Sequence, residues 1–350
     1  MNRMLIVFAA VLVAVIGGYA LMSLDGEGDA GMDVSGTDVT PPSSNDADMG
    51  HAEIVAEYGT QITVRAVPDM GMSFYGWFED GTLISDRMIE TFPKESVDSI
   101  EAVFSEGFTK SVEYDWEMPL FSSEGEPSGL TRHMTFSVYI WSGDYWTSVM
   151  DDGRLRHVTY ADPMPTFMLD DSSAVDQAVE YLDPLMDGLT NLQKATVLAY
   201  FVQDTVSYMS DTEQYGVTEF WASAEETLYT GYGDCEDTAT LLVNLGARLG
   251  LDVGFVAFES STMGHMSAAV ALEDGESAQD DAVFDVDEVR YAYVETAIDN
   301  AHSGVGQLTP AYSISDGNWT HVVYDGSGYI GSATVPIGSG TVTGAPMIYG

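Results

Sequence analysis

Charge is the feature that most limits what this chain can fold into. Its 350 residues include 56 acidic side chains against 11 lysines and arginines, a formal net charge of −45 at pH 7. Such self-repulsion keeps a protein soluble but penalises a compact state unless counterions screen it. The acids are scattered through every segment, so we interpret them as an adaptation to salty or acid-rich surroundings. Nucleic acid is almost excluded as a partner, because no basic patch exists to release counterions from phosphates.

The composition still provides a core. Hydrophobic residues make up 45% and aromatic residues 11% of the chain, which predicts a folded protein, and the length allows two domains. A lone cysteine, Cys235, rules out an intramolecular disulfide. Considered alone, it would be a small buried apolar residue, but its neighbours in the sequence favour a different interpretation.

The N-terminus carries an uncharged apolar run at residues 4–24, between Arg3 and the acids from Asp25 onward. At ~1.5 Å per residue, such a run can cross a ~30 Å hydrocarbon core. Positive charge before it and negative charge after it place the N-terminus in the cytoplasm and the rest outside. A cleaved signal peptide is the alternative, but no A-x-A-like site directly follows. We therefore expect residues 1–24 to be a single-pass anchor in the cell membrane; both alternatives export the remaining chain.

The next two segments differ sharply in composition. Residues 25–50 are mostly Asp, Gly, Ser, Thr and Pro, which predicts a flexible acidic linker. Residues 51–107 predict a small β module, because two runs alternate apolar and polar residues. The apolar positions are Ile62, Val64 and Ala66, then Ile100, Ala102 and Phe104. Between them, the F-x-G-W-x-x-D-G pattern from Phe74 to Gly81 resembles the β-grasp-like repeats of bacterial and archaeal surface proteins, which implies a spacer or adhesion module.

Residues 108–325 predict an α+β domain, and residues 326–350 a tail rich in Gly, Ser and Thr. A strand is expected where Met134, Phe136, Val138 and Ile140 alternate with polar residues. Helices are expected after the capping-box pairs Ser173/Asp176 and Thr190/Gln193, the second reaching Tyr208, and from Cys235 to Leu249. Three strands are expected at residues 252–258, 265–272 and 291–297, with an acidic loop at 273–288.

The sequence around the lone cysteine is Gly231-Tyr232-Gly233-Asp234-Cys235-Glu236-Asp237. The two glycines predict a tight turn that places Cys235 at the start of a helix. The positive end of a helix stabilises a thiolate, and the amide of Cys235 can donate to the oxyanion formed when a thiolate attacks an acyl carbon. Glu236 and Asp237 oppose the thiolate, so a cationic partner is needed.

His265 is the expected partner. It opens a predicted strand 30 residues after Cys235, and Glu295 lies a further 30 residues along in another predicted strand. Taken singly, the histidine would be a structural residue and the glutamate a solvated one. Together, the carboxylate could accept the second N–H of the histidine and stabilise the imidazolium.

At these residues the chain resembles the archaeal and bacterial transglutaminase-like superfamily. The shared elements are Phe201-Val202-Gln203, Phe220-Trp221, Gly233-Asp234-Cys235-Glu236-Asp237, Gly264-His265-Met266 and Tyr293-Val294-Glu295-Thr296. The resemblance covers roughly residues 114–310 and implies a papain-like α+β fold, a Cys-His-acid triad and acyl transfer from an amide. Most relatives use aspartate as the third member, so the longer Glu295 is a departure.

The resemblance implies two further roles. Gln203 or Trp221 would supply a second oxyanion donor, with core packing as the alternative. In periplasmic bacterial relatives, acids that flank the cysteine bind Ca²⁺, which maps to Asp234 and Asp237; simple complementarity to the helix N-terminus is the preferred interpretation. No other cofactor is expected. The remaining histidines have no spacing suited to zinc: His51, His133, His157, His302 and His321.

These observations predict an extracytoplasmic cysteine peptidase or amidase that acts on protein or peptide substrates. The first alternative keeps the chemistry but transfers the acyl group to an amine, which would cross-link proteins. The second is a non-catalytic cell-surface binding or adhesion module. The presence of Cys235, His265 and Glu295 together argues against the second alternative.

Overall fold

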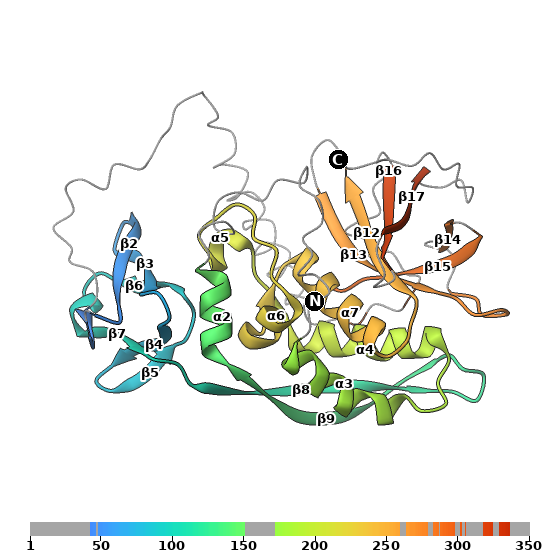
Figure 1. Ribbon diagram of the computed structural model, residues 1–350, viewed down its shortest axis with the longest axis horizontal. Coiled ribbons are helices and arrows are strands. Elements are labelled where there is room, and N and C mark those ends of the chain that lie inside the picture. Colours follow the sequence, from blue (N-terminus) through green and yellow to red (C-terminus); the bar gives the residue numbers. More distant parts are fainter. Residues whose placement is uncertain are drawn as a thin grey trace, which may run out of the picture. The chain divides into compact units, whose positions relative to one another are not determined.

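The computed structural model describes residues 43–46, 48–150, 172–259, 264–278, 283–286, 288–297, 302, 305, 318–324 and 329–336. The chain divides into two compact units, Met1–Thr40 and Pro41–Gly350, and every described residue lies in the second. Within it, a strand-rich N-terminal region is followed by helices and then by a large sheet (Figure 1). No helix of the described residues is long and apolar enough to span a membrane, and residues 1–24 lie outside them.

The N-terminal β module consists of two small sheets. One is antiparallel and contains β2 (Gly50–Tyr58), β3 (Gln61–Pro68) and β6 (Ile89–Pro93). The other has the order β1 (Ser43–Ser44), β7 (Ile100–Ser105), β4 (Ser73–Glu79) and β5 (Thr82–Ser85). All the predicted inward positions of β3 and β7 are buried. Their alternation therefore marked the core face of each strand.

The aromatic motif lies in β4 and the turn after it. Trp77 is fully buried and donates its indole N–H to the carbonyl of Arg87 at 2.9 Å. The turn to β5 uses the positive φ angles of Asp80 (49°) and Gly81 (76°), as a tight hairpin requires. The β-grasp-like expectation is not met. Among the described residues of the module, the helical structure is a 3-10 turn at Val97–Ser99, so the strands have no helix to wrap.

A long antiparallel hairpin, β8 (Thr109–Phe121) and β9 (Pro127–Trp141), leads into the helices and lies along their lower side in Figure 1. Phe136, Val138 and Ile140 are buried on one face of β9, as their alternation predicts. The rings of Tyr114 and Phe136 contact Phe201 with centroid distances of 5.8 and 5.6 Å. The hairpin therefore forms the floor on which helix α4 packs.

The described helices are α2 (Ser142–Val149), α3 (Ser173–Leu182), α4 (Asn191–Thr205), α5 (Asp211–Gln214), α6 (Ala224–Thr230) and α7 (Cys235–Arg248), with a 3-10 turn at Asp183–Met186. The predicted capping box at Thr190 and Gln193 is confirmed at the start of α4. The box predicted at Ser173 is displaced by one residue, because Ser172 is the N-cap and accepts from the Val175 amide.

Helix α4 ends at Thr205, earlier than predicted. Ser207–Tyr208 instead forms strand β10, which pairs in parallel with β11 (Tyr232–Gly233). The amides of Ser207 and Met209 donate to the carbonyls of Gly231 and Gly233 at 2.9 and 3.0 Å. Continuing the helix would forfeit this pairing, which depends on residues that are distant in sequence.

The C-terminal sheet has six antiparallel strands and packs against α7. Their order is β14 (Val283–Val286), β15 (Val289–Val294), β13 (Gly264–Ala271), β12 (Val253–Glu259), β16 (Asn318–Tyr324) and β17 (Tyr329–Pro336). Strands β12, β13 and β15 lie close to their predicted positions. Two other expectations were wrong, because β14 lies inside the predicted acidic loop and β17 inside the predicted tail. Each gains backbone pairing along a neighbouring strand.

Candidate active site

Cys235 is the first residue of α7, as the glycine-rich turn predicts. Asp234 is the N-cap, and Asp237 completes a capping box by accepting the Asp234 amide on Oδ2 at 3.3 Å. The other oxygen of Asp237 accepts the amide of Ala222 at 2.7 Å. Both oxygens of Asp237 therefore hold backbone groups around Cys235.

The thiol of Cys235 is surrounded by acid. Its S–H donates to Oε2 of Glu236 at 2.9 Å. Burial, then the charges of Glu236 and Asp234, raise the pKa of the thiol well above its ordinary value, and the amide of Met266 only partly opposes them. The expected lowering by the helix N-terminus is outweighed in the structure. Cys235 is therefore a neutral thiol at rest.

His265 and Glu295 lie together inside the domain. Nε2 of His265 is 3.3 Å from Oε2 of Glu295, and the two residues are 5% and 0% exposed. His265 is on β13 beside Met266, whose amide reaches the sulfur of Cys235. Thr238 of α7 also lies 3.0 Å, oxygen to oxygen, from Thr296, next to Glu295. The helix that carries the cysteine is thus joined to the strands that carry the histidine and the acid.

The carboxylate of Glu295 is held on every side. Oε1 accepts the amides of Thr296 and Ala297 at 2.9 and 3.1 Å, and Oε2 accepts the hydroxyl of Tyr293 at 2.6 Å. Burial alone would raise the pKa of Glu295, but the hydrogen bond and charge of His265, with Tyr293 and Ala297, lower it overall. Glu295 is therefore ionised at neutral pH.

Tyr293 is a site residue that sequence reasoning missed. Its hydroxyl lies 2.6 Å from Oε2 of Glu295 and 3.4 Å from Nε2 of His265, and the residue is 1% exposed. A signal was available, because residues two apart along an extended chain point to the same face.

The two predicted oxyanion donors are engaged elsewhere. The side-chain amide of Gln203 donates to the backbone carbonyl of Glu295 at 2.7 Å. The single indole N–H of Trp221 donates to Glu219 at 2.5 Å, so Trp221 is not aimed at an acyl oxygen. The structure places Gln203 against the acid of the predicted triad.

A group of acids, here called the acidic cluster, lies beside the cysteine. It contains Asp211, Glu219, Asp234, Glu236 and Asp237, whose side-chain oxygens come within 4.8 Å of one another in overlapping groups. Burial is the main cause of the raised pKa values of Asp211, Glu219, Asp234 and Asp237, and repulsion from neighbouring acids adds to it; the pKa is about 9 for Asp211 and about 8 for Glu219. The flanking pair Asp234 and Asp237 was predicted, whereas Asp211 and Glu219 come from other segments. These oxygens are the group best able to hold a hard cation.

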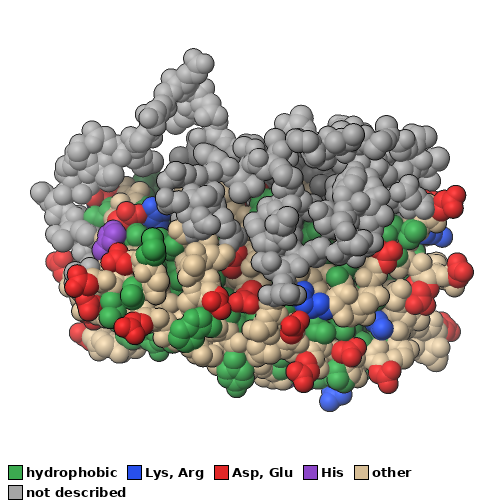
Figure 2. Space-filling view, in the orientation of Figure 1, with side chains coloured by type: hydrophobic (Ala, Val, Ile, Leu, Met, Phe, Trp, Pro, Cys, Tyr) green, Lys and Arg blue, Asp and Glu red, His purple; other side chains and the backbone are tan. Residues whose placement is uncertain are grey.

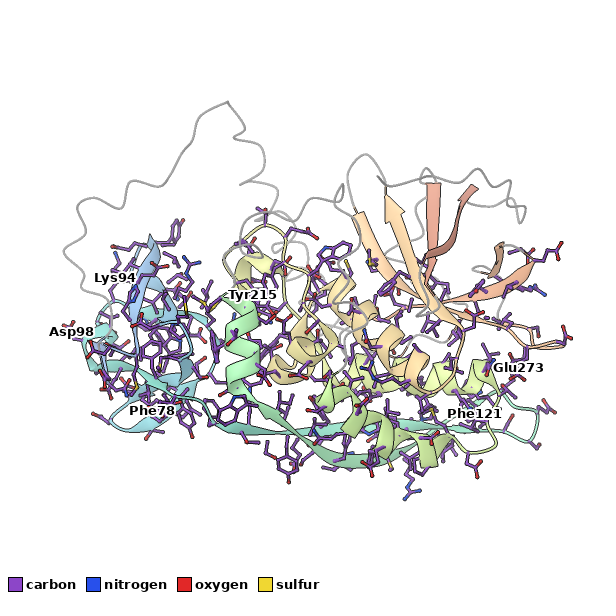
Figure 3. The ribbon with its side chains drawn as sticks, viewed as in Figure 1. Phe78, Lys94, Asp98, Phe121, Tyr215 and Glu273 are labelled. Atoms are coloured by element: carbon purple, nitrogen blue, oxygen red, sulfur yellow. The ribbon has the colours of Figure 1, made fainter. Side chains whose placement is uncertain are left out.

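A turn of the chain brings the distant acids to the cysteine. Asp211 starts α5 and accepts the amide of Phe220 on Oδ2 at 2.5 Å, which closes the loop between them. Tyr215, labelled in Figure 3, directly follows α5, and its ring packs on Phe220 with a centroid distance of 4.0 Å. Both rings are fully buried, so the pair anchors the two ends of the loop in the core.

The arrangement defines a class: a thiol at the start of a helix that packs against a strand carrying a histidine, with an acid beside that histidine. Residues 181–302 match the family model of the transglutaminase-like superfamily. The chain therefore contains a domain of the transglutaminase-like superfamily, as the sequence motifs predicted. No curated protein matches the chain.

Three solved structures are similar to parts of the chain. A putative cysteine protease from Cytophaga hutchinsonii is 12% identical, with a TM-score of 0.27, over 67% of this chain and 74% of that one. A structure described as a TGase is 11% identical, with a TM-score of 0.28, over 62% and 65% of the two chains. A putative protease from Parabacteroides distasonis is 9% identical, with a TM-score of 0.26, over 69% and 68%. The family assignment rests on the match of residues 181–302 and not on these likenesses.

Proposed function

We propose that the protein is a cysteine peptidase or amidase that cleaves amide bonds in protein or peptide substrates. Cys235 is the nucleophile, His265 the general base and acid, and Glu295 the residue that orients His265. The observation that carries the proposal is the buried contact between His265 and Glu295, made where β13 packs against the helix that begins at Cys235. A non-catalytic role has no need of a buried, ionised carboxylate that faces a histidine.

The neutral resting thiol determines the order of events. His265 takes the thiol proton as the sulfur attacks the acyl carbon, because the surrounding carboxylates disfavour a preformed thiolate. Nε2 faces Glu295, so Nδ1 is the nitrogen that exchanges the proton. The imidazolium then protonates the leaving amine as the C–N bond breaks, which leaves a thioester on Cys235. Water, deprotonated by His265, hydrolyses the thioester and restores the thiol.

Charge develops at two places during the attack, and each has a partner. The acyl oxygen becomes an oxyanion next to the helix N-terminus, where the amide of Cys235 can donate. The imidazolium forms beside the ionised carboxylate of Glu295. The Tyr293 hydroxyl and two backbone amides keep that carboxylate in place, so it stabilises the cation without reorganising.

The proposal includes a location. The apolar run at residues 4–24 and the charges on either side of it support a single membrane anchor with residues 51–350 outside the cytoplasm. Protease added to intact cells would then digest the domain from outside. Protection of the domain until lysis would contradict this location, and a mature protein that begins beyond Leu24 would favour a cleaved signal.

The reaction is tested by incubating the purified protein with a peptide library and identifying the products by mass spectrometry. Hydrolysis of amides is expected for the wild-type protein, and none for Cys235→Ala or His265→Ala. A parallel incubation with a small primary amine reports the competing transfer reaction, because an amine adduct has a different mass from an acid. Cleavage that survives Cys235→Ala, or a wild-type protein that forms no acyl-enzyme with any peptide, would overturn the proposal.

A further inference from the structure

Two positive side chains line a small cavity beside the turn that precedes Cys235. The cavity measures about 30 Å³, and its walls include Arg87, Lys110, Met209 and Tyr232. Arg87 lies between β5 and β6, Lys110 is on β8, and Met209 directly follows β10. The chain has only 11 lysines and arginines against 56 acids, so two cations at one cavity favour an anionic ligand there.

The guanidinium of Arg87 is only partly satisfied. Nη1 lies 3.8 Å from Oε2 of Glu90, which is too long for a direct hydrogen bond. On the other edge of the group, Nη2 donates to the sulfur of Met209 at 3.4 Å, a weak acceptor, and Nε is buried with no hydrogen-bond partner. Folded proteins normally satisfy such a buried donor with a protein, water or ligand acceptor. The edge formed by Nε and Nη2 lies against Met209 of the cavity wall and lacks a strong acceptor.

Lys110 adds a second positive charge to the cavity wall. Its ammonium donates to Oδ2 of Asp86 and to the carbonyl of Tyr229, both at 2.9 Å, and lies 4.5 Å from the centre of the Tyr229 ring. The side chains of Arg87 and Lys110 are 32% and 23% exposed, so solvent reaches both. Asp86 offsets part of the charge of Lys110. The guanidinium of Arg87 is therefore the stronger attraction for an anion.

Gln214 is a second residue of the cavity wall with an unmet hydrogen bond. It is 7% exposed, and its Nε2 donates to the hydroxyl of Tyr215 at 2.9 Å, while its Oε1 is buried and has no partner. The oxygen and nitrogen of a side-chain amide have almost the same shape, so a half-turn of the amide exchanges them. Oε1 then accepts the Tyr215 hydroxyl, and Nε2 is free to donate to a ligand. An acceptor bound in the cavity would thus satisfy both Arg87 and Gln214.

We propose that this cavity binds a carboxylate group, with the edge formed by Nε and Nη2 of Arg87 as its main contact. That edge of a guanidinium presents two parallel N–H groups, which match the two oxygens of a carboxylate. The flexible thioether of Met209 gives up its weak contact to make way. The cavity of about 30 Å³ is roughly two to three times the space that one water needs, so it takes a carboxylate group and not a whole amino acid.

The carboxylate has two sources with the same chemistry: a free small acid, or an acidic residue of a peptide. The second source would deepen the proposed function, because peptides are the substrate class of the proposed hydrolase, and Tyr232 of the cavity wall lies three residues before Cys235. Binding of a carboxylate as such does not depend on the hydrolase proposal.

The test is a titration of ¹³C-formate, the smallest carboxylate, with the purified full chain, followed through the broadening of the formate NMR line. A background of 1 M NaCl shortens the Debye length to about 3 Å, which screens long-range attraction. Chloride also competes throughout, but it offers a single acceptor where a carboxylate offers two. We therefore expect saturable binding of formate under these conditions.

Arg87→Lys keeps the positive charge but removes the paired N–H groups, so formate binding should weaken about tenfold or more. Lys110→Gln should weaken it by a smaller factor, and it serves alone if Arg87→Lys does not fold. The matched control Arg132→Lys, at an exposed position on β9, should bind like the wild type. Binding that both test variants retain in full, or a wild-type protein with no saturable binding, would overturn the site.

The two sources are distinguished with a capped tripeptide that has aspartate at its centre and a second one with asparagine there. Both are added to the Cys235→Ala protein, which lacks the proposed nucleophile. Displacement of formate by the aspartate peptide at a lower concentration than by acetate supports a peptide ligand, and displacement by acetate alone supports a free acid. Equal displacement by the asparagine peptide would overturn the assignment to a carboxylate. Binding is measured without turnover, so a failure of the hydrolase proposal would leave this result intact.

Discussion

Glu295 is the residue on which the proposed chemistry depends most after the nucleophile and base. Its carboxylate accepts four hydrogen bonds, from His265, Tyr293, Thr296 and Ala297. A glutamate reaches this position where an aspartate, one methylene shorter, would stop short. Glutamate in place of aspartate therefore lengthens the acidic side chain by one methylene, and the buried contact with His265 is still made.

Replacing Glu295 with Gln keeps the size of the side chain but removes the charge that stabilises the imidazolium. In a serine triad, neutralising the acid lowers turnover by about 10⁴-fold. Because the thiol of Cys235 is neutral at rest, we expect a loss on the order of 10³–10⁴-fold in kcat with little change in KM. Steady-state kinetics on a cleaved peptide checks this, with circular dichroism as the folding control. Unchanged kcat would make Glu295 a bystander.

The acidic cluster makes the stability of the cation-free protein depend on pH. The folded pKa values of Asp211 (about 9) and Glu219 (about 8) lie above their unfolded values. Between the two, the folded state binds more protons than the unfolded state, so the free energy of unfolding falls as pH rises. We expect a loss from pH 5 to pH 8 of at most about 1.4 kcal/mol per pH unit for each group. Urea melts in EDTA measure it, and a free energy that rises over this range would contradict it.

Helix α7 is the element that connects Cys235, the proposed nucleophile, to the sheet. Its first turn carries Cys235, and its last turn packs on β12 through Gly246. A Cβ at Gly246 would lie 2.9 Å from Cγ1 of Val253, closer than a normal contact. The glycine is there to let helix and strand approach.

Gly246→Ala should therefore destabilise the protein, although alanine favours helix by about 1 kcal/mol. Overpacking of this kind costs about 1–3 kcal/mol, so we expect a net loss of about 1 kcal/mol in the free energy of unfolding. Chemical denaturation checks the sign. Adding Val253→Ala makes room for the new methyl, so Gly246→Ala should be neutral or stabilising in that background. A penalty of the same size there would show that contact with Val253 is not the cause.

At the scale of the whole molecule, the surface charge dominates. Figure 2 shows acidic side chains spread over the described part of one face, with few lysines or arginines among them. The described ion pairs are isolated contacts, such as Lys94 with Glu57 (2.5 Å) in the β module and Lys110 of β8 with Asp86 (2.9 Å). They cannot balance a net charge of −45, so screening must come from solution.

Raising NaCl from 0.1 to 1 M shortens the Debye length from about 10 to 3 Å. Repulsion across the folded surface should fall, so the midpoint of urea unfolding should move to higher urea. KCl should act almost equally, because screening depends on ionic strength and not on the identity of the cation. A midpoint that is unchanged or lower in high salt would show that self-repulsion does not limit stability.

Much of the fold followed from local patterns. Alternation located β3, β7 and β9, and the Thr190 capping box and the Gly-Asp-Cys turn located the starts of α4 and α7. The sequence also pointed to Cys235, His265 and Glu295. Asp211 and Glu219 could not be found this way, because a loop closed by a long-range hydrogen bond brings them to α7. β10 and β17 were missed for the same reason. Each becomes a strand by pairing with a neighbouring strand, and no local sequence pattern specifies that pairing.

The short β10–β11 pair couples the position of Cys235 to the position of Glu295. Helix α4 holds the carbonyl of Glu295 through Gln203, and the chain that leaves its C-terminus holds the turn before Cys235 through the carbonyls of Gly231 and Gly233. If α4 shifts, the acid and the nucleophile shift in the same direction, and the distance between them changes less than either position. The spacing between Cys235 and Glu295 should therefore tolerate small movements of the helix that holds them both.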